Sequence, residues 1–285
     1  MSFGQDFHAF LAPGADRLVR LSGMLARRSL EGKVLAIGGR RHLLVRLSSG
    51  APTTILVAHY DRVEGSPGAL DNSAACLVLA EAGARIFRDP QALEGVFLLF
   101  TDGEEAPSTG SPLSQGAYAL ATGLRKVFGR ARPSIYIFDV LGRGGRLLLS
   151  TASRRVAEGQ RALLDAMESR AFAAATAANL AAPRRLPLPW SDDLGFTLAG
   201  MPSVAISLLP EAEAVLLERG LASCDPSATD RFPGREGLGK AWPPTWDILH
   251  SPEDGPELIE KIAMEKMGDF CLSLCRTCGV ASTFL

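Results

Sequence analysis

A buried β-strand that ends at a histidine and an aspartate is predicted by residues 53–61, TTILVAHYD. A run that is almost continuously apolar is typical of a strand covered on both faces of a sheet. A second run of this kind, residues 96–100 (VFLLF), is followed within a few residues by Glu104 and Glu105. The two runs predict a sheet enclosed between helices, with polar groups at one edge.

Segments with strand and helix character alternate along the rest of the chain. Runs rich in strand formers occupy residues 33–37, 42–47, 53–59, 96–101, 134–140 and 203–208. Helical spacing is found near residues 72–87, 114–127, 154–179 and 256–278, and in two surface pieces within the first thirty residues. This alternation predicts an α/β fold, a three-layer α/β/α sandwich with a central mixed, mostly parallel sheet, and a single domain over residues 1–285.

The proline- and glycine-rich stretch 209–247 interrupts this alternation and shows little periodic structure. Long loops within compact domains are usually functional or disordered. We therefore expect an active-site loop there, with Trp242 and Trp246 as candidate substrate contacts.

Charge and composition exclude several classes of protein. The 285 residues carry 30 basic and 31 acidic side chains, a formal charge of −1, so no net field favours nucleic acid or an anionic membrane. We see no secretion signal and no apolar run of membrane-spanning length. Five cysteines in a chain of this size do not resemble a disulfide framework. We expect a cytoplasmic protein with free thiols; the sequence predicts no particular oligomeric state.

Side chains that can bind metal follow the predicted strands. They are His59, Asp71, the pair Glu104 and Glu105, and Asp139, with His250 much later in the chain. The carboxyl ends of parallel strands meet at one edge of an open α/β sheet, so we expect these groups to converge. Imidazole and carboxylate both suit Zn²⁺, and two ions can be held if one carboxylate bridges them.

Individual residues of this constellation suggest different tasks. Asp71 is the natural bridging carboxylate, although an aspartate there could instead cap the following helix. Asp61 can accept the second ring N–H of His59 and so orient it. Of the adjacent Glu104 and Glu105, one can bind metal while the other faces the reacting water as a base. Asp139, inside an apolar run, would be costly to bury without a partner.

Three cysteines near the end of the chain, Cys271, Cys275 and Cys278, have a spacing that elsewhere holds an iron–sulfur cluster. The same spacing places them on one face of a helix. Because free cysteine is commonly buried, we expect them to be part of the core.

These blocks together resemble the zinc aminopeptidases of the bacterial leucyl aminopeptidase type, a family that also contains glutaminyl cyclases and glutamate carboxypeptidase. The resemblance covers residues 53–260. Its blocks are His59-Tyr60-Asp61, residues 68–74 (GALDNSA), Glu104-Glu105, residues 139–142 (DVLG), Ser191-Asp192 with Phe196, and His250 followed by Asp254.

The resemblance implies a zinc-exopeptidase-like fold and two zinc ions bridged by Asp71. It implies that His59 and Asp139 complete the ligand set of one ion and that Glu105 and His250 complete that of the other. Glu104 would be the general base and acid. The substrate would be a peptide or a small amino-acyl compound that loses its N-terminal residue.

The sequence departs from the family pattern next to Asp192, a candidate substrate contact. Asp193, a second candidate contact, stands where the family usually has histidine, and Gly195 stands where it usually has proline. After His250 the family usually has threonine, whereas here Ser251 keeps a hydroxyl.

Two other functions fit the same residues. A glutaminyl cyclase uses this ligand set with one zinc ion, but cyclases usually carry an acidic residue at Ser191 and a tryptophan at Leu249. An inactive relative would keep the fold as a binding module, but such relatives generally lose ligands, and here all five and Glu104 are present.

Overall fold

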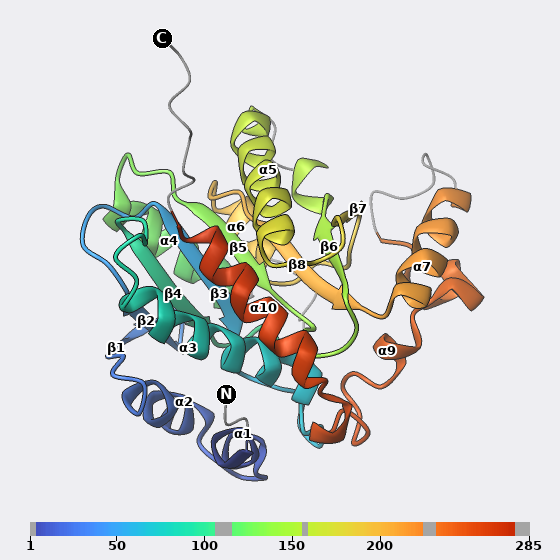
Figure 1. Ribbon diagram of the computed structural model, residues 1–285, viewed down its shortest axis with the longest axis horizontal. Helices are drawn as coiled ribbons and strands as arrows, with labels where there is room; N and C mark the ends of the chain where they lie inside the picture. Colours follow the sequence, from blue (N-terminus) through green and yellow to red (C-terminus); the bar gives the residue numbers. More distant parts are fainter. Residues whose placement is uncertain (1–3, 106–115, 156–158, 225–231, 277–285) are drawn as a thin grey trace.

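The computed structural model describes residues 4–105, 116–155, 159–224 and 232–276. Its strands are β1 (Gly32–Ile37), β2 (Arg40–Arg46), β3 (Thr54–His59), β4 (Val96–Thr101), β5 (Ser134–Phe138), β6 (Arg146–Ser150), β7 (Arg184–Leu186) and β8 (Val204–Leu209). They form one eight-stranded sheet in the order β1-β2-β4-β3-β5-β8-β6-β7 (Figure 1).

The centre of the sheet is parallel. β3 pairs in parallel with β4 on one side and β5 on the other, and β5 pairs in parallel with β8. β2 runs antiparallel to β4, and β6 runs antiparallel to β8. Every residue of β3, β4 and β8 is buried, as expected for near-continuous apolar strands covered on both faces.

Helices cover both faces of the sheet. The main ones are α1 (Gly4–Leu11), α2 (Arg17–Ala26), α3 (Ala74–Phe87), α4 (Gly116–Phe128), α5 (Arg161–Ala177), α6 (Asp192–Leu198) and α10 (Lys261–Leu274). One core joins α1, α2, α3, α5 and α10 to the sheet, whereas a second core joins α4 and α6 to its other face (Figure 1). The predicted three-layer α/β/α sandwich is confirmed.

The predicted strands agree with the structure to within about two residues, but β6 and β7 lie outside the predicted runs. β6 follows a glycine-rich turn at residues 142–145. Gly142 and Gly144 have positive φ there, 99° and 84°, and a Cβ on Gly144 would lie 2.2 Å from the carbonyl carbon of Leu209. Only glycine fits this close approach.

The expectation of a loop over residues 209–247 is wrong in its secondary structure. This stretch contains α7 (Glu211–Ser223), α8 (Gly234–Leu238), a 3₁₀ turn (Gly239–Ala241) and α9 (Pro244–Asp247). α7 is rich in strong helix formers, and the prolines of the stretch lie outside it. Its Ala214 and Leu217 pack with Trp246 in a third apolar cluster.

The C-terminal helix predicted over 256–278 is shorter in the structure. A 3₁₀ turn (Pro256–Leu258) precedes α10, which ends at Leu274. Cys271 and Cys275 are fully buried, as predicted, and Cys278 lies outside the described residues.

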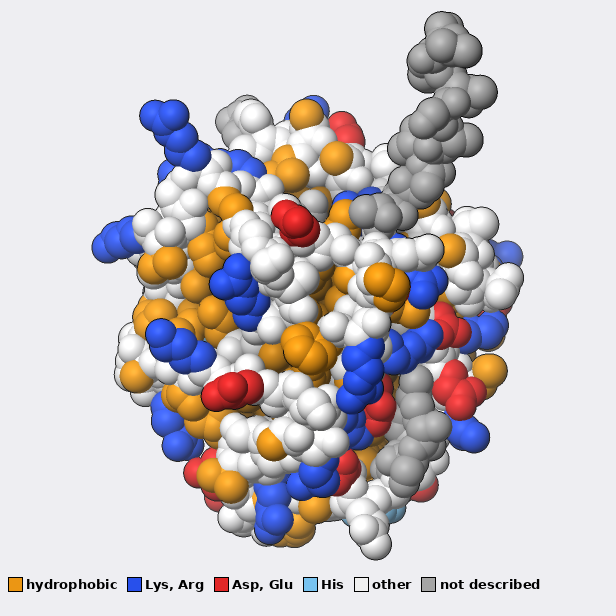
Figure 2. Space-filling model, turned by 60° about the vertical axis from the view of Figure 1, so that its left-hand side comes forward, with side chains coloured by type: hydrophobic (Ala, Val, Ile, Leu, Met, Phe, Trp, Pro, Cys, Tyr) orange, Lys and Arg blue, Asp and Glu red, His pale blue; other side chains and the backbone are white. Residues whose placement is uncertain are grey.

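Basic and acidic side chains are interspersed on the face in Figure 2, which turns the β1–β2 side of the sheet forward. This mixture agrees with the near-zero formal charge. Among the described residues, no helix is both long and apolar enough to cross a bilayer.

Candidate metal centre

The carboxyl ends of the three adjacent parallel strands bring the predicted groups together. His59 is the last residue of β3, Asp139 directly follows β5, and Glu104 and Glu105 follow β4 by three and four residues. Asp71 lies in the π-helical turn Ala69–Ser73 before α3. The N-cap of α3 is Ser73, whose side chain makes no capping hydrogen bond, so Asp71 does not cap that helix.

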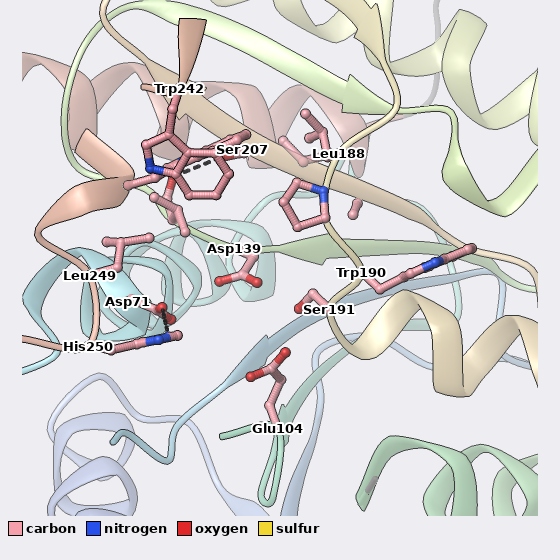
Figure 3. Close-up of a pocket in the computed structure, with 15 residues that line it drawn as sticks. Asp71, Glu104, Asp139, Leu188, Trp190, Ser191, Ser207, Trp242, Leu249 and His250 are labelled. Atoms are coloured by element: carbon pink, nitrogen blue, oxygen red, sulfur yellow. Dashed lines mark hydrogen bonds and ion pairs between the residues drawn. The ribbon is translucent and has the colours of Figure 1, made fainter. Parts of the chain in front are cut away.

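Asp71 lies between the two histidines. Its Oδ1 is 3.1 Å from Nε2 of His59. Its Oδ2 is 3.1 Å from Nε2 of His250, a contact marked in Figure 3. Asp139 Oδ1 lies 3.3 Å from His59 Nε2, and Glu105 Oε2 lies 3.3 Å from His250 Nε2. The five side chains thus form two sets of three that share Asp71.

The donor set fits zinc. Each set offers imidazole and carboxylate atoms, and three protein ligands with an open fourth position are usual for catalytic zinc. The donor atoms of His59, Asp71 and Glu105 lie within 4.8 Å of one another. Oε1 of Glu105 is buried with no hydrogen-bond partner among the described residues. Burial and the negative charge of Asp71 raise the pKa of Glu105, so a cation beside it would relieve both costs.

Asp61 connects the two glutamates to His59. Its Oδ1 lies 3.5 Å from Nδ1 of His59, which is long for a hydrogen bond. Its Oδ2 accepts a hydrogen bond from the backbone N–H of Glu105 at 2.9 Å, and its Oδ1 accepts one from Glu104 at 3.4 Å. Although burial raises the pKa of Asp61, the nearby His59 imidazole and the hydrogen bonds from these backbone groups hold it below its ordinary value. Asp61 therefore holds the loop that carries Glu104 and Glu105, whereas its orientation of the His59 imidazole stays a prediction.

Glu104 faces the open side of the centre. It lines the same pocket as Asp71, Asp139 and Ser191 (Figure 3). Burial raises its pKa well above 4.5, and the charges of Asp139 and Asp192 raise it further. A carboxyl group in this position can take up and return a proton.

The pocket beside the centre is a cavity of about 370 Å³ with largely apolar walls. Its apolar lining comprises Val140, Leu188, Pro189, Trp190, Ala205, Ile206, Trp242, Trp246 and Leu249. The rings of Trp242 and Trp246 meet edge to face, with centroids 5.2 Å apart. Both tryptophans expected at the pocket are thus there. None of the described residues that line it is a lysine or arginine.

Asp192 and Asp193 are not among the residues that line this pocket. Both are fully buried: Asp192 accepts a hydrogen bond from the Thr101 hydroxyl, and Asp193 accepts one from the backbone N–H of Ser191 at 2.9 Å. Burial raises the pKa of Asp192 to about 6 and that of Asp193 to about 7. Asp193 thus contacts the pocket wall at Ser191 and Asp192 contacts β4 at Thr101, and their contact with substrate stays a prediction.

Three residues that sequence reasoning gave no role also hold the site. Asp254 is fully buried and accepts hydrogen bonds from the backbone N–H groups of Leu70, at 2.7 Å, and Asp71, at 3.2 Å. Asn72 donates to the carbonyl of Phe138 at 2.7 Å. Arg17 reaches the site from the N-terminal helices. Only the position of Asp254, four residues after His250, offered a signal in the sequence.

His250 also has an unusual backbone conformation. Its φ is 61°, and φ of Val140, the residue after Asp139, is 53°. Left-handed conformations are uncommon for residues other than glycine and persist at functional sites where the surroundings hold them. The backbone is therefore strained at or beside two of the candidate ligands.

A comparison with protein families matches residues 43–275 to peptidase family M28. The chain belongs to peptidase family M28. This confirms the predicted family and the predicted enzyme class, a zinc-dependent hydrolase of the metallopeptidase group. A search of curated proteins found no match for this M28 chain.

Solved structures resemble the M28 chain at low identity. A zinc aminopeptidase from Bacillus subtilis has 18% identity and a TM-score of 0.55, over 82% of this chain and 49% of that one. A leucine aminopeptidase precursor from Bacteroides thetaiotaomicron has 16% identity and a TM-score of 0.64, over 95% and 92%. A glutaminyl cyclase from Porphyromonas gingivalis has 17% identity and a TM-score of 0.64, over 96% and 92%. The M28 chain thus spans about half the length of the first relative, and all three share its fold.

Proposed function

We propose that this M28 chain is an aminopeptidase that holds two zinc ions and removes an apolar N-terminal residue from peptides or small amino-acyl compounds, in the cytoplasm. The observation that carries the proposal is the position of Asp71, whose two oxygens each lie 3.1 Å from a different histidine. His59, Asp71 and Asp139 would hold one ion, and Asp71, Glu105 and His250 the other. When bound, zinc supplies Lewis-acid chemistry, which polarises a carbonyl and lowers the pKa of water.

Glu104 would carry the proton in this reaction. Its carboxylate accepts a proton from the attacking water and returns it to the nitrogen of the leaving group. Such proton transfer by a positioned side chain typically contributes about 10²–10⁴ in rate. Glu104 lines the pocket next to Asp71 and Asp139, which supports this role.

The charges of the pocket favour an amine at the substrate end. Asp71, Glu104 and Asp139 line it, whereas no lysine or arginine is found among its described lining residues. Apart from the zinc ions, a substrate carboxylate would have no cationic side chain as a partner there, and an unpaired buried charge is costly. A free α-amine needs no such side chain. This favours an aminopeptidase over a carboxypeptidase.

The apolar walls suggest which N-terminal residues fit. Leu188, Trp242 and Leu249 surround the cavity on the side away from Glu104 (Figure 3). Burying a leucine- or phenylalanine-sized side chain there contributes about 1.5–3 kcal/mol relative to leaving it exposed. Leucine and phenylalanine are therefore proposed as better N-terminal residues than glycine or aspartate.

Glutaminyl cyclisation is the second candidate, because the cyclase from Porphyromonas gingivalis matches nearly the full length of both chains. The two positions at which cyclases usually differ, Ser191 and Leu249, both line the pocket here. Neither carries the residue expected of a cyclase, so the aminopeptidase is favoured.

The products of hydrolysis and of glutaminyl cyclisation differ in mass, so one experiment can distinguish the two reactions. Zinc-loaded protein is incubated with leucyl and phenylalanyl arylamides, their N-acetyl derivatives and a peptide with N-terminal glutamine, and the products are analysed by mass spectrometry. We expect cleavage of the free-amine arylamides, no cleavage of the acetylated controls, and glutamine released as the free amino acid. Conversion of the glutamine peptide to its pyroglutamyl form, without arylamide cleavage, would overturn the proposal in favour of the cyclase.

A further inference from the structure

The N-terminal helices α1 and α2 form a hairpin that precedes the residues matched to family M28, which begin at residue 43. In Figure 1 the two helices lie together below α3. No described residue of the hairpin lines the pocket at the metal centre. Two arginines nevertheless connect the hairpin to the chain segments that carry His59, Asp61 and Asp71.

Arg17, the first residue of α2, reaches from the hairpin into these segments. Its Nε donates a hydrogen bond to the carbonyl of Tyr60, the residue between His59 and Asp61. Its Nη2 donates to the hydroxyl of Ser73 at 3.0 Å, two residues after Asp71. One guanidinium thus joins the end of β3 to the turn that carries Asp71.

The guanidinium of Arg17 is held on its other side by α1. Its Nη1 donates to the carbonyl of Phe10 at 3.4 Å, and its Cζ lies 4.0 Å from the centroid of the Phe10 ring. The side chain is buried, with 8% of its surface exposed. A planar group with several fixed donors and an aromatic face beneath it has little freedom to rearrange.

Arg62 makes the reciprocal contact from the site to the hairpin. Its Nη1 donates to the carbonyl of Leu11, at 2.8 Å, and to that of Pro67, at 2.9 Å, and its Nη2 donates to Ala12 at 3.2 Å. Leu11 and Ala12 lie at the C-terminal end of α1, where a positive charge is favourable. The hairpin and the ligand-bearing segments are thus joined in both directions.

The burial of Arg17 needs an explanation beyond packing. Desolvation lowers its pKa to about 10, so it stays charged at neutral pH. Its hydrogen bonds go to neutral oxygens, while Asp61 and Asp71 are acidic groups whose charge favours the cation. A methylene chain alone would fill the space without the cost of burying a charge.

We propose that the α1–α2 hairpin braces the metal centre, with Arg17 as a positioning residue that fixes the segments bearing His59 and Asp71 relative to each other. This inference rests on the proposed function, because it assumes that these residues hold zinc. Groups that orient metal ligands typically change metal affinity by about 10–100-fold when removed. Arg17 is not among the residues that line the pocket, so substrate binding should change little.

The test compares Arg17→Gln with Arg20→Gln, a change at an exposed arginine of the same helix. Three quantities are measured: the unfolding midpoint of the metal-free protein, the zinc dissociation constant by competition with a chelating dye, and kcat and KM on leucyl arylamide. We expect Arg17→Gln to weaken zinc binding by about 10–100-fold and to lower kcat at limiting zinc, with KM changed less than about threefold. Arg17→Lys, which keeps the charge but has all its N–H donors on a single nitrogen, should recover part of the affinity.

Ser73→Ala removes one hydrogen-bond partner of Arg17 and keeps Arg17 itself. It provides a second test of the proposal if Arg17→Gln fails to fold. If Arg17→Gln does not fold, a drop in zinc affinity in Ser73→Ala supports the brace. Unchanged zinc affinity in a folded Arg17→Gln, or in Ser73→Ala where Arg17→Gln does not fold, overturns it. An equal loss in Arg20→Gln also overturns it. Failure of the unmodified protein to bind zinc would instead refute the proposed function.

Discussion

Replacing Asp254 with asparagine should weaken the metal centre without touching a metal ligand. The Asp254 carboxylate is fully buried and accepts the backbone N–H groups of Leu70, at 2.7 Å, and Asp71, at 3.2 Å. Burial raises its pKa to about 6, so at pH 8 it is ionised and both hydrogen bonds involve a charged acceptor. In Asp254→Asn the amide can accept only one of them and turns an NH₂ group toward the other N–H.

The size of the effect follows from these two contacts. A hydrogen bond to a charged group contributes about 1.5–3 kcal/mol, and a buried donor left without a partner costs about 1–3 kcal/mol. Because the fold raises the pKa of this carboxyl group from 3.8 to about 6, its ionisation costs about 3 kcal/mol of stability at pH 8, which offsets the lost hydrogen bonds. We therefore expect Asp254→Asn to change the unfolding free energy of the metal-free protein by less than about 2 kcal/mol. The displaced Asp71 backbone should also weaken zinc binding by about 10–100-fold.

The assay is urea unfolding at pH 8, with and without zinc, followed by tryptophan fluorescence. Glu253→Gln, at the exposed neighbouring position, is the matched control and should change stability by less than about 0.5 kcal/mol. With zinc present the variant should lose stability relative to the unmodified protein, because its weaker metal binding contributes less to the folded state. An Asp254→Asn protein with the zinc affinity of the control would refute this account of how Asp71 is positioned.

Three further predictions concern the reaction, the departure from the family pattern and the pocket. Glu104→Gln should keep its zinc but lower kcat by about a hundredfold or more, measured as arylamide turnover at equal metal content; unchanged turnover would remove Glu104 from the mechanism. Because the pKa of Asp193 rises from 3.8 in the unfolded chain to about 7 in the fold, its contribution to stability should be lost between about pH 4 and pH 7, up to about 4 kcal/mol. Asp193→Asn should reduce the stability lost over this pH range by up to about 4 kcal/mol in urea unfolding of the metal-free protein, while the other buried carboxyl groups keep their share. An unaltered slope would show that Asp193 does not contribute to it. Trp242→Leu should raise KM for leucyl arylamide about 5–10-fold and change kcat less than about threefold, whereas an equal rise for alanyl arylamide would argue against an apolar contact in the pocket.

Local sequence predicted much of the fold. The strands at the centre of the sheet have apolar runs long enough to identify them. In the helices around them, apolar residues recur with the helical period. β7 has only three residues, and β6 has five. Whether such short segments form strands depends more on their pairing with distant strands than on their composition. α7 was missed because its flanking prolines outweighed its helix formers in the prediction of a loop.

The candidate site was predictable where its residues follow strands. His59, Glu104, Glu105 and Asp139 converge because β3, β4 and β5 are parallel neighbours. The residues that hold them are joined by contacts between distant parts of the chain. Asp254 contacts Leu70 across 184 positions, and Arg17 contacts Tyr60 across 43. No local pattern encodes such pairs.

The central claim is that Asp71 bridges two metal ions, and the number of zinc ions bound per chain tests it most directly. Protein purified without chelator is titrated with zinc, freed of excess and analysed by native mass spectrometry, with Asp71→Asn in parallel. The account predicts two zinc ions per wild-type chain and a loss of at least one in Asp71→Asn. A wild-type chain that binds one zinc ion would contradict the bridge and favour the cyclase, and a chain that binds none in excess zinc would contradict the metal centre itself.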